Sequence, residues 1–180
     1  MVPCKLLLML KEVEIYDDYL PHRLYAKIHD YWMGKKDTGE FRHSCPWIVD
    51  NLSYQDHIQY VHMVYSSHTI LTPGWETILP IVEEEDMVAV ARIKANAVNK
   101  TDKLIVFPEY HCDFAPDMKH MITGIYYINS NDGYTLFENG QEVESIGNRF
   151  VRFPANMRHT GTTCTNADRR LLINFNYFKY

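Results

Sequence analysis

The stretch MITGIYYINSNDGYTLFENGQEVESIGNRFVRFPAN (residues 121–156) decides the fold that the sequence predicts. It consists of short runs rich in isoleucine, tyrosine, phenylalanine and valine. Polar turn signals separate these runs, namely Asn131-Asp132-Gly133, Asn139-Gly140 and Gly147-Asn148. Aromatic and β-branched residues favour strands, and Asn-Gly or Asp-Gly pairs favour tight turns between antiparallel strands. The stretch therefore predicts a β-sandwich or a jelly roll.

Strand patterns continue on both sides of this stretch. Before it lie MVAVARIKANAV (87–98) and KLIVF (103–107), and after it comes RRLLINFNYF (169–178). Upstream of residue 87 the apolar residues instead recur at helical intervals. The fold class predicted is mainly β with N-terminal helices packed on the outer sheet, an α+β arrangement with a jelly-roll core.

Two helices are expected in the N-terminal part. The first covers residues 16–32 and places one apolar face over Leu20, Leu24, Ile28 and Tyr31. The second covers SYQDHIQYVHMVYSS (53–67), where Ser53 is a plausible N-cap. In this second segment the helical spacing involves Ile58, Val61 and Tyr65. A loop is expected between the two helices, around residues 34–46.

Composition and charge limit the functional classes. The chain has 180 residues, 46% of them apolar, which fits one soluble globular domain over 1–180. The formal net charge of −5 gives no basic footprint for a nucleic acid. The acidic run 83–86 is interpreted as a solvated cap. The apolar run 6–10 is too short to span a bilayer or to act as a secretory signal.

The cysteines are widely spaced. Because they form no C-x-x-C pair, structural zinc is not expected, and reduced thiols in a cytoplasm are the default. The four positions are Cys4, Cys45, Cys112 and Cys164.

The segment PEYHCDFAPD (108–117) raises the first chemical hypothesis. In a strand, residues i and i+2 point the same way, so His111 and Asp113 would present an imidazole and a carboxylate together. A metal ion needs such a pair. Taken alone, the motif is weak, and a solvated turn is the alternative. Cys112 would face the other way and is interpreted as a packing residue.

A second histidine has a related setting. His159 follows FVRFPANMR, where a strand is expected to end, and precedes the polar loop TGTTCTNAD. With His111 and Asp113 it would supply two imidazoles and one carboxylate, leaving three metal positions open. Non-haem Fe(II) oxygenases use this arrangement. The alternative is a histidine in a surface loop.

Arg170 opens the final strand, eleven residues after His159. An oxygenase that uses 2-oxoglutarate must hold the distal carboxylate of this cosubstrate. A buried guanidinium does so through a charge-assisted and often bidentate pair. Arg170 is thus a candidate anchor.

The ordered motifs HCD, TGIYYINSNDGYTLF, RFPANMRHTG and RRLLINFNYF resemble the Fe(II)/2-oxoglutarate-dependent dioxygenases of the prolyl-hydroxylase-like type. The resemblance covers residues 87–180, and within that type the chain looks closest to small members encoded by marine bacteriophages. It implies a double-stranded β-helix in which His111, Asp113 and His159 hold Fe(II) and Arg170 anchors 2-oxoglutarate. It also points to Tyr127 as a cosubstrate-binding residue, with a core aromatic as the equal alternative. Ile125 shares that face.

Strand parity distinguishes Arg170 from its neighbour Arg169. An inward Arg170 brings with it Leu172, Asn174 and Asn176, a mostly polar row that suits a cavity. An inward Arg169 would instead bring in an apolar row that suits packing beneath helices, made of Leu171, Ile173, Phe175 and Tyr177. We therefore expect Arg170 to face the cavity and Arg169 to lie outside it.

The implied activity is hydroxylation, or a related oxidation, of a C–H bond, with 2-oxoglutarate and O2 consumed and succinate and CO2 released. The expected substrate is peptidyl and prolyl-like. The rivals are a cupin-like module that binds a metal or small ligand without oxygen chemistry, and a nucleic-acid demethylase of the same superfamily. Residues 1–86 would form a mostly helical support and 87–180 the catalytic core. The expected location is cytoplasmic, in the host cell if the protein is phage-encoded.

Other candidates are weaker. Arg92 and Lys94 could point towards the mouth of the site, and a solvated strand face explains them equally well. The remaining histidines considered are interpreted as exposed or locally hydrogen-bonded, or as having no evident partner: His57, His62, His68 and His120.

Overall fold

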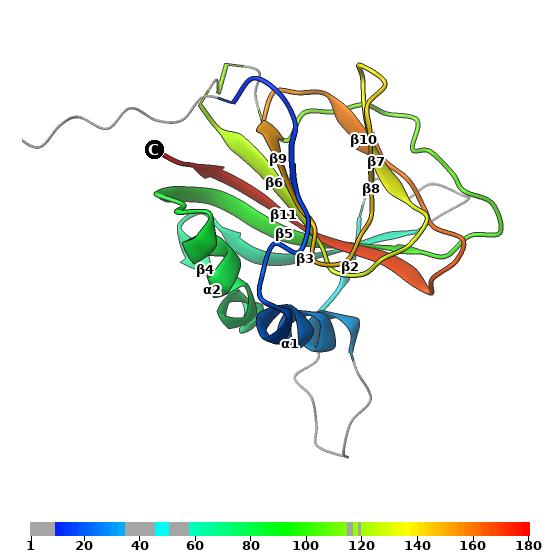
Figure 1. Ribbon diagram of the computed structural model, residues 1–180, viewed down its shortest axis with the longest axis horizontal. Helices are drawn as coiled ribbons and strands as arrows, with labels where there is room; N and C mark the ends of the chain where they lie inside the picture. The colour runs from blue at the N-terminus through cyan, green and yellow to red at the C-terminus, as the bar shows by residue number, and fades with distance from the viewer. Residues whose placement is uncertain (1–9, 35–45, 51–57, 115–116, 119) are drawn as a thin grey trace, which may run out of the picture.

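The computed structural model describes residues 10–34, 46–50, 58–114, 117–118 and 120–180. Within these ranges the chain forms two helices, α1 (His22–Met33) and α2 (Gly74–Glu84), and eleven strands (Figure 1). The strands are β1 (Glu14–Tyr16), β2 (Ile48–Val49), β3 (Gln59–Ser66), β4 (Thr69–Ile70), β5 (Ala89–Asn99), β6 (Ile122–Tyr127), β7 (Tyr134–Phe137), β8 (Glu142–Glu144), β9 (Phe150–Pro154), β10 (His159–Gly161) and β11 (Arg169–Phe178).

The strands form a large and a small antiparallel sheet. The large sheet has the order β1-β9-β6-β11-β5-β3-β2, with β4 paired to β3, and the small sheet has the order β10-β7-β8. Figure 1 shows the small sheet over one face of the large sheet and both helices against the other face. This is the double-stranded β-helix, mainly β with N-terminal helices, that the sequence predicted.

The central strand β11 separates the two faces of the large sheet. Its residues Leu171, Ile173, Phe175 and Tyr177 belong to the core beneath the helices, together with Ile28 of α1 and Ile78 and Ile81 of α2. Burial of each such large side chain contributes about 1.5–3 kcal/mol. The opposite row faces the small sheet and begins with Arg170, so the predicted parity is confirmed.

Helix α1 confirms the first predicted helix with a later start. Tyr16 ends strand β1 instead, and α1 begins after Pro21, which has no N–H to donate and a fixed φ. The helix ends at Gly34, whose φ of 67° is in the left-handed region that glycine adopts without strain. Ile28 and Trp32 are buried on its inner face.

The second predicted helix is wrong. Residues 51–57, including Ser53 and His57, lie outside the described residues, and the rest of the segment forms strand β3. This strand pairs with β5 along its length, and its burial alternates so that His62 and Val64 are buried. The apolar positions fit both periodicities, and the long-range pairing with β5 selected the strand. The N-terminal part therefore extends the large sheet.

The acidic run at the end of α2 is only partly a solvated cap. Glu83, Glu84 and Asp86 are exposed, as expected, but Glu85 is 2% exposed. Its carboxylate pairs with Arg152 at 3.2 Å and accepts hydrogen bonds from the Tyr19 and Tyr177 hydroxyls. Glu85 thus joins the end of α2 to β9 and β11, a set of contacts that the local sequence did not indicate.

Smaller expectations differ in outcome. Residues 103–107 form no strand and contribute only an isolated bridge from Val106 to Thr162. Cys112 and Cys164 are free thiols, and Cys4 and Cys45 lie outside the described residues. Neither of the helices in the described part of the chain has the length and apolar character that crossing a membrane would require.

Candidate functional site

Three predicted metal ligands lie together between the two sheets. One potential ligand atom from each of His111, Asp113 and His159 lies within 4.8 Å of the other two. The histidine backbones form an isolated antiparallel bridge, in which each N–H donates to the carbonyl of the other at 3.0 Å. Two imidazoles and one carboxylate form a donor set that could hold a divalent transition metal.

The proton position on His159 is fixed by the backbone. Its Nδ1 lies 3.0 Å from the Met157 carbonyl, and because a carbonyl only accepts, Nδ1 carries the proton. The other nitrogen, Nε2, therefore offers a lone pair, and it lies 4.0 Å from Asp113 Oδ2. Phe137 and Phe153 pack around the ring, and burial lowers the pKa of His159. The neutral, ligand-competent form of the imidazole is thereby favoured.

The Asp113 carboxylate is held from two sides. Arg92 Nη2 donates to Oδ1 at 3.0 Å, and the Thr123 hydroxyl donates to Oδ2 at 3.0 Å. The side chain is 4% exposed, and this burial by itself would raise its pKa. The nearby His159 ring, Arg92 and Thr123 outweigh burial, so the pKa of Asp113 lies below its usual range. The carboxylate stays charged, as a metal ligand must be.

His111 and Asp113 were expected to point the same way because they would lie in one strand, and this expectation was only partly correct. The segment around them is not a regular strand, and its sole ladder contact is the bridge from His111 to His159. Cys112 points elsewhere, and its Sγ lies 3.1 Å from the Asn156 carbonyl. The i and i+2 side chains therefore converge because the loop is pinned to β10, and not because a strand continues.

A cavity of about 210 Å³ extends from the metal cluster along the inner face of the large sheet. Its lining includes His111 and His159 of the metal cluster and also Arg170. Strand β11 supplies Arg170, Leu172 and Asn174, the row that parity predicted to face inwards. The remaining lining residues come from β3, β5, β6, the small sheet and the loop before His111, and are Gln59, Lys94, Asn96, Val98, Phe107, Glu109, Ile125, Thr135, Thr160 and Gly161.

Arg170 is buried and firmly oriented, with 3% of its surface exposed. Its Nε donates to the Ser145 hydroxyl at 2.7 Å, and Nη2 donates to the Thr135 hydroxyl at 3.0 Å. A guanidinium has five N–H groups, so donors remain for an anion. Gly133 makes room for the side chain, since a Cβ there would lie 2.7 Å from Arg170 Cδ.

Tyr127 lies behind the guanidinium. The Arg170 Cζ is 5.7 Å from the centre of the Tyr127 ring, and the Tyr127 hydroxyl donates to Thr135 at 2.8 Å. The residue is completely buried in the core between the sheets. Thr135 and Ile125 line the cavity, whereas Tyr127 is not among the described residues that line it. A direct role of Tyr127 towards a cosubstrate therefore stays a prediction, and its visible contacts orient Thr135 and Arg170.

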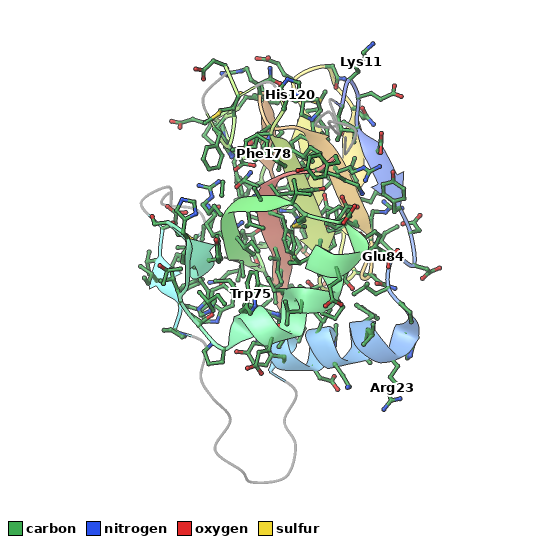
Figure 2. The ribbon with its side chains drawn as sticks, turned by 90° about the vertical axis from the view of Figure 1, so that its left-hand side faces the viewer. Lys11, Arg23, Trp75, Glu84, His120 and Phe178 are labelled. Carbon is green, nitrogen blue, oxygen red and sulfur yellow. The ribbon has the colours of Figure 1, made fainter. Side chains whose placement is uncertain are left out.

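Both residues proposed for the site mouth on β5 face inwards. Arg92 contacts Asp113, and Lys94 lines the cavity. The other histidines lie elsewhere. His62 is buried, with its nitrogens 2.8 Å from the Pro46 carbonyl and 3.0 Å from the Thr72 hydroxyl. His68 is in an exposed turn, and Figure 2 shows His120 at the end of the molecule opposite the two helices.

Several site residues had no signal in the sequence. Thr123, Thr135 and Ser145 orient Asp113 and Arg170, yet small hydroxyl residues in strands are too common to be singled out. The pairing of Arg92 with Asp113 is also non-local. A partial signal was the parity of β5, because Arg92, Lys94 and Asn96 alternate with apolar residues in an otherwise buried strand.

No protein-family model matches the chain, and no curated protein is similar to it in sequence. Solved structures are similar in fold. A prolyl hydroxylase from Trichoplax adhaerens, in complex with a peptide of a hypoxia-inducible factor, has a TM-score of 0.60 and 13% identity over 93% of this chain and 83% of its own. A 2-oxoglutarate/Fe(II) oxygenase-family protein from Burkholderia pseudomallei has a TM-score of 0.60 and 13% identity, covering 92% and 85%.

A viral collagen prolyl hydroxylase from Paramecium bursaria Chlorella virus 1, bound to 2-oxoglutarate, has a TM-score of 0.55 and 10% identity over 94% of this chain and 97% of its own. At these identities the likeness shows the fold. The structural neighbours of this chain include Fe(II)/2-oxoglutarate oxygenases, several of which are prolyl hydroxylases.

Proposed function

We propose that this protein is an Fe(II)- and 2-oxoglutarate-dependent dioxygenase that hydroxylates a C–H bond. One observation carries the proposal. A single cavity is lined by both histidines of the metal cluster and by a buried, preoriented arginine. The metal cluster alone would also suit a metal-binding cupin. A buried guanidinium at a distance from the cluster suits a cosubstrate that is anionic at one end and chelates metal at the other.

The residues fit Fe(II) and 2-oxoglutarate. The ligand set of His111, Asp113 and His159 leaves three of six positions open, which a bidentate cosubstrate and O2 require. The cavity also contains buried polar atoms that find no partner among the described residues, the Oδ1 atoms of Asn96 and Asn174. Buried polar atoms in native proteins are nearly always satisfied, so such atoms indicate that the cavity receives a polar ligand or water.

The chain's own residues would prepare the site for the reaction. The Met157 carbonyl keeps the proton of His159 on Nδ1, so that Nε2 is free to bind metal. Arg92 and Thr123 orient the carboxylate of Asp113.

Ser145 and Thr135 hold the guanidinium of Arg170 before a ligand arrives, which reduces the ordering needed on binding. The bound iron, with 2-oxoglutarate and O2, supplies the oxidising chemistry and releases succinate and CO2.

We further propose a peptidyl, prolyl-type substrate. The support is the fold shared with prolyl hydroxylases, one of which is bound to a peptide. This proposal also includes the kinship with phage-encoded enzymes and a cytoplasmic location. It further includes the division of the chain into an N-terminal support and a catalytic core over 87–180. A nucleic-acid substrate fits poorly with the net charge of −5.

The test is anaerobic calorimetry with Fe(II) and then 2-oxoglutarate, followed by measurement of succinate after O2 is admitted. We expect both ligands to bind and succinate to form slowly without a primary substrate and faster with a proline-rich peptide. Asp113→Ala should abolish succinate formation, whereas the exposed Asp117→Ala should not. Metal binding without 2-oxoglutarate binding would indicate the cupin-like module instead. Stimulation of turnover only by methylated single-stranded nucleic acid would indicate a demethylase.

A further inference from the structure

The inner face of strand β5 carries three polar residues in succession. Arg92, Lys94 and Asn96 lie opposite Asn176, Asn174 and Leu172 of β11, respectively. This face continues onto β3, where Met63 lies opposite Lys94 and Val61 opposite Asn96. Lys94 and Asn96 thus add a second row to the cavity lining, directly beside the row of β11 that leads to Arg170.

The small sheet covers only part of the inner face. The core between the sheets contains Tyr127 and Ile125 of β6, Val151 and Phe153 of β9 and Leu172 of β11, packed against Phe137 and Val143 of the small sheet. No residue of β5 or β3 belongs to that described core. The cosubstrate end of the cavity therefore lies under the small sheet, and the β5 side lies beside it.

The charged residues of this side differ in their contacts. Arg92 is fully engaged, because it donates to Asp113 and Asn176 and lies over the Phe114 ring. Lys94 is half-buried, and its ammonium has no hydrogen bond or ion pair with any residue that the structure describes. Burial and the charge of Arg92 lower the pKa of Lys94, and the negative charges of Asp50 and Asp113 offset this effect only in part. A half-buried cation that makes no hydrogen bond or ion pair with the described residues is costly, and an incoming anion would relieve that cost.

Two hydrogen-bond acceptors accompany the ammonium. Asn174 lies directly opposite Lys94, and Asn96 lies two residues further along β5. Their Oδ1 atoms are buried and have no partner among the described residues, and both side chains line the cavity. Amide oxygens only accept, so the group that satisfies them must bring N–H or O–H donors.

We propose that Lys94, Asn96 and Asn174 form the subsite for the primary substrate, and that this substrate bears a carboxylate next to an N–H group. The carboxylate pairs with Lys94, and the N–H group donates to the two amide oxygens. A monoanion is favoured over a phosphate, because one ammonium is present and the exposed Glu109 on the same cavity opposes further negative charge. This inference rests on the proposed function and adds to it the chemical class of the substrate.

Two sources offer this chemistry. A free amino acid such as proline carries both groups on one carbon, and a peptide offers them when an acidic residue adjoins the oxidised one. The probes are therefore L-proline with L-prolinamide, in which an amide replaces the carboxylate, and an end-capped Pro-Glu pentapeptide with its Pro-Gln counterpart. Each is titrated anaerobically by calorimetry into protein loaded with Mn(II) and 2-oxoglutarate, so that binding is read without turnover.

We expect at least one carboxylate probe to bind ten times or more tighter than its amide counterpart, a difference of about 1.4 kcal/mol. Lys94→Met should remove this preference and leave the affinity for 2-oxoglutarate within about twofold, while Lys94→Arg should retain it. The matched control is Lys11→Met, at an exposed position labelled in Figure 2. Preference for L-proline would identify a free amino acid, and preference for the Pro-Glu peptide an acidic peptide.

Three results would overturn the inference. Equal binding of the carboxylate and amide probes, or no binding of either carboxylate probe to the loaded protein, would exclude a carboxylate subsite. Weaker 2-oxoglutarate binding by Lys94→Met would assign Lys94 to the cosubstrate. In each case the proposed function stands as long as wild-type protein binds 2-oxoglutarate. If it does not, the proposed function fails first and this inference falls with it.

Discussion

Replacing Arg170 with alanine should weaken the binding of 2-oxoglutarate at least tenfold, whereas the same change at Arg169 should alter it little. Arg170 is 3% exposed and lines the same cavity as His111 and His159. Arg169 lies on the opposite parity of β11 and is partly exposed. The two adjacent arginines thus form a matched pair that differs in the direction of the side chain.

The magnitude follows from the contacts. Hydrogen bonds to charged groups contribute about 1.5–3 kcal/mol, and since about 1.4 kcal/mol corresponds to a factor of ten, loss of the guanidinium should raise the dissociation constant about 10- to 150-fold. The change also leaves the hydroxyls of Ser145 and Thr135 without their guanidinium partner. Some loss of stability is therefore expected, and Arg170→Met, which fills more of the space, serves as a second variant.

The assay is calorimetric titration of 2-oxoglutarate into Mn(II)-loaded protein, with the melting temperature of each variant measured beside it. Titration is performed well below the lowest melting temperature, so that every variant is folded. Unchanged affinity in both Arg170 variants would refute the assignment of the anchor. A large loss in Arg169→Ala with none in Arg170→Ala would show that the register of β11 is displaced by one residue.

Arg92→Met should weaken metal binding about 10- to 100-fold, because loss of a residue that orients a metal ligand commonly has this effect. The exposed Arg158→Met should leave the metal affinity unchanged. Titration with Mn(II) measures both affinities. Glu85→Gln should lower the free energy of unfolding, measured by urea titration, by about 3–5 kcal/mol, because the buried charge of Arg152 loses its partner carboxylate. The exposed Glu84→Gln should change the free energy of unfolding by less than about 0.5 kcal/mol. Slight burial raises the pKa of Asp132, but hydroxyl and amide donors of the facing loop lower it overall. Its charge therefore stabilises the fold above the unfolded pKa of about 3.9, and the gap in melting temperature between wild type and Asp132→Asn should close as pH falls below that value.

Each of these predictions has a contradicting result. Metal affinity unchanged in Arg92→Met would mean that Thr123 alone orients the carboxylate. Equal stability of Glu85→Gln and Glu84→Gln would mean that the buried carboxylate contributes no net stabilisation. If the difference in melting temperature between wild type and Asp132→Asn widens in acid, the pKa of Asp132 is raised in the folded protein and not lowered.

The sequence predicted the part of the fold that carries the candidate site better than the N-terminal part. In β11 polar and apolar residues alternate over 173–177, so a single parity argument placed Arg170 and Asn174 in the cavity and Phe175 beneath the helices. In β3 the same residues satisfied both periodicities, and only pairing with β5, some thirty residues away, determined the outcome. Local pattern cannot decide such a case.

The candidate site shows the same limit. The proximity of His111, Asp113 and His159 followed from motif order and resemblance, although the expected strand around the first two is absent from the described structure of that segment. The contacts of Arg92 and Glu85 could not be predicted, because each links segments more than twenty residues apart in the chain. Such partners are selected by tertiary packing, which a single sequence does not display.

The reciprocal backbone bridge between His111 and His159 has a consequence for the order of events in the life of the protein. The two amide hydrogen bonds involve no metal, so folding alone can bring the two imidazoles into register. Under the proposed function, the protein would be able to fold first and acquire iron later, and to lose and regain it without unfolding. Supply of iron would then set how much of the protein is active at a given time, and not how much of it survives.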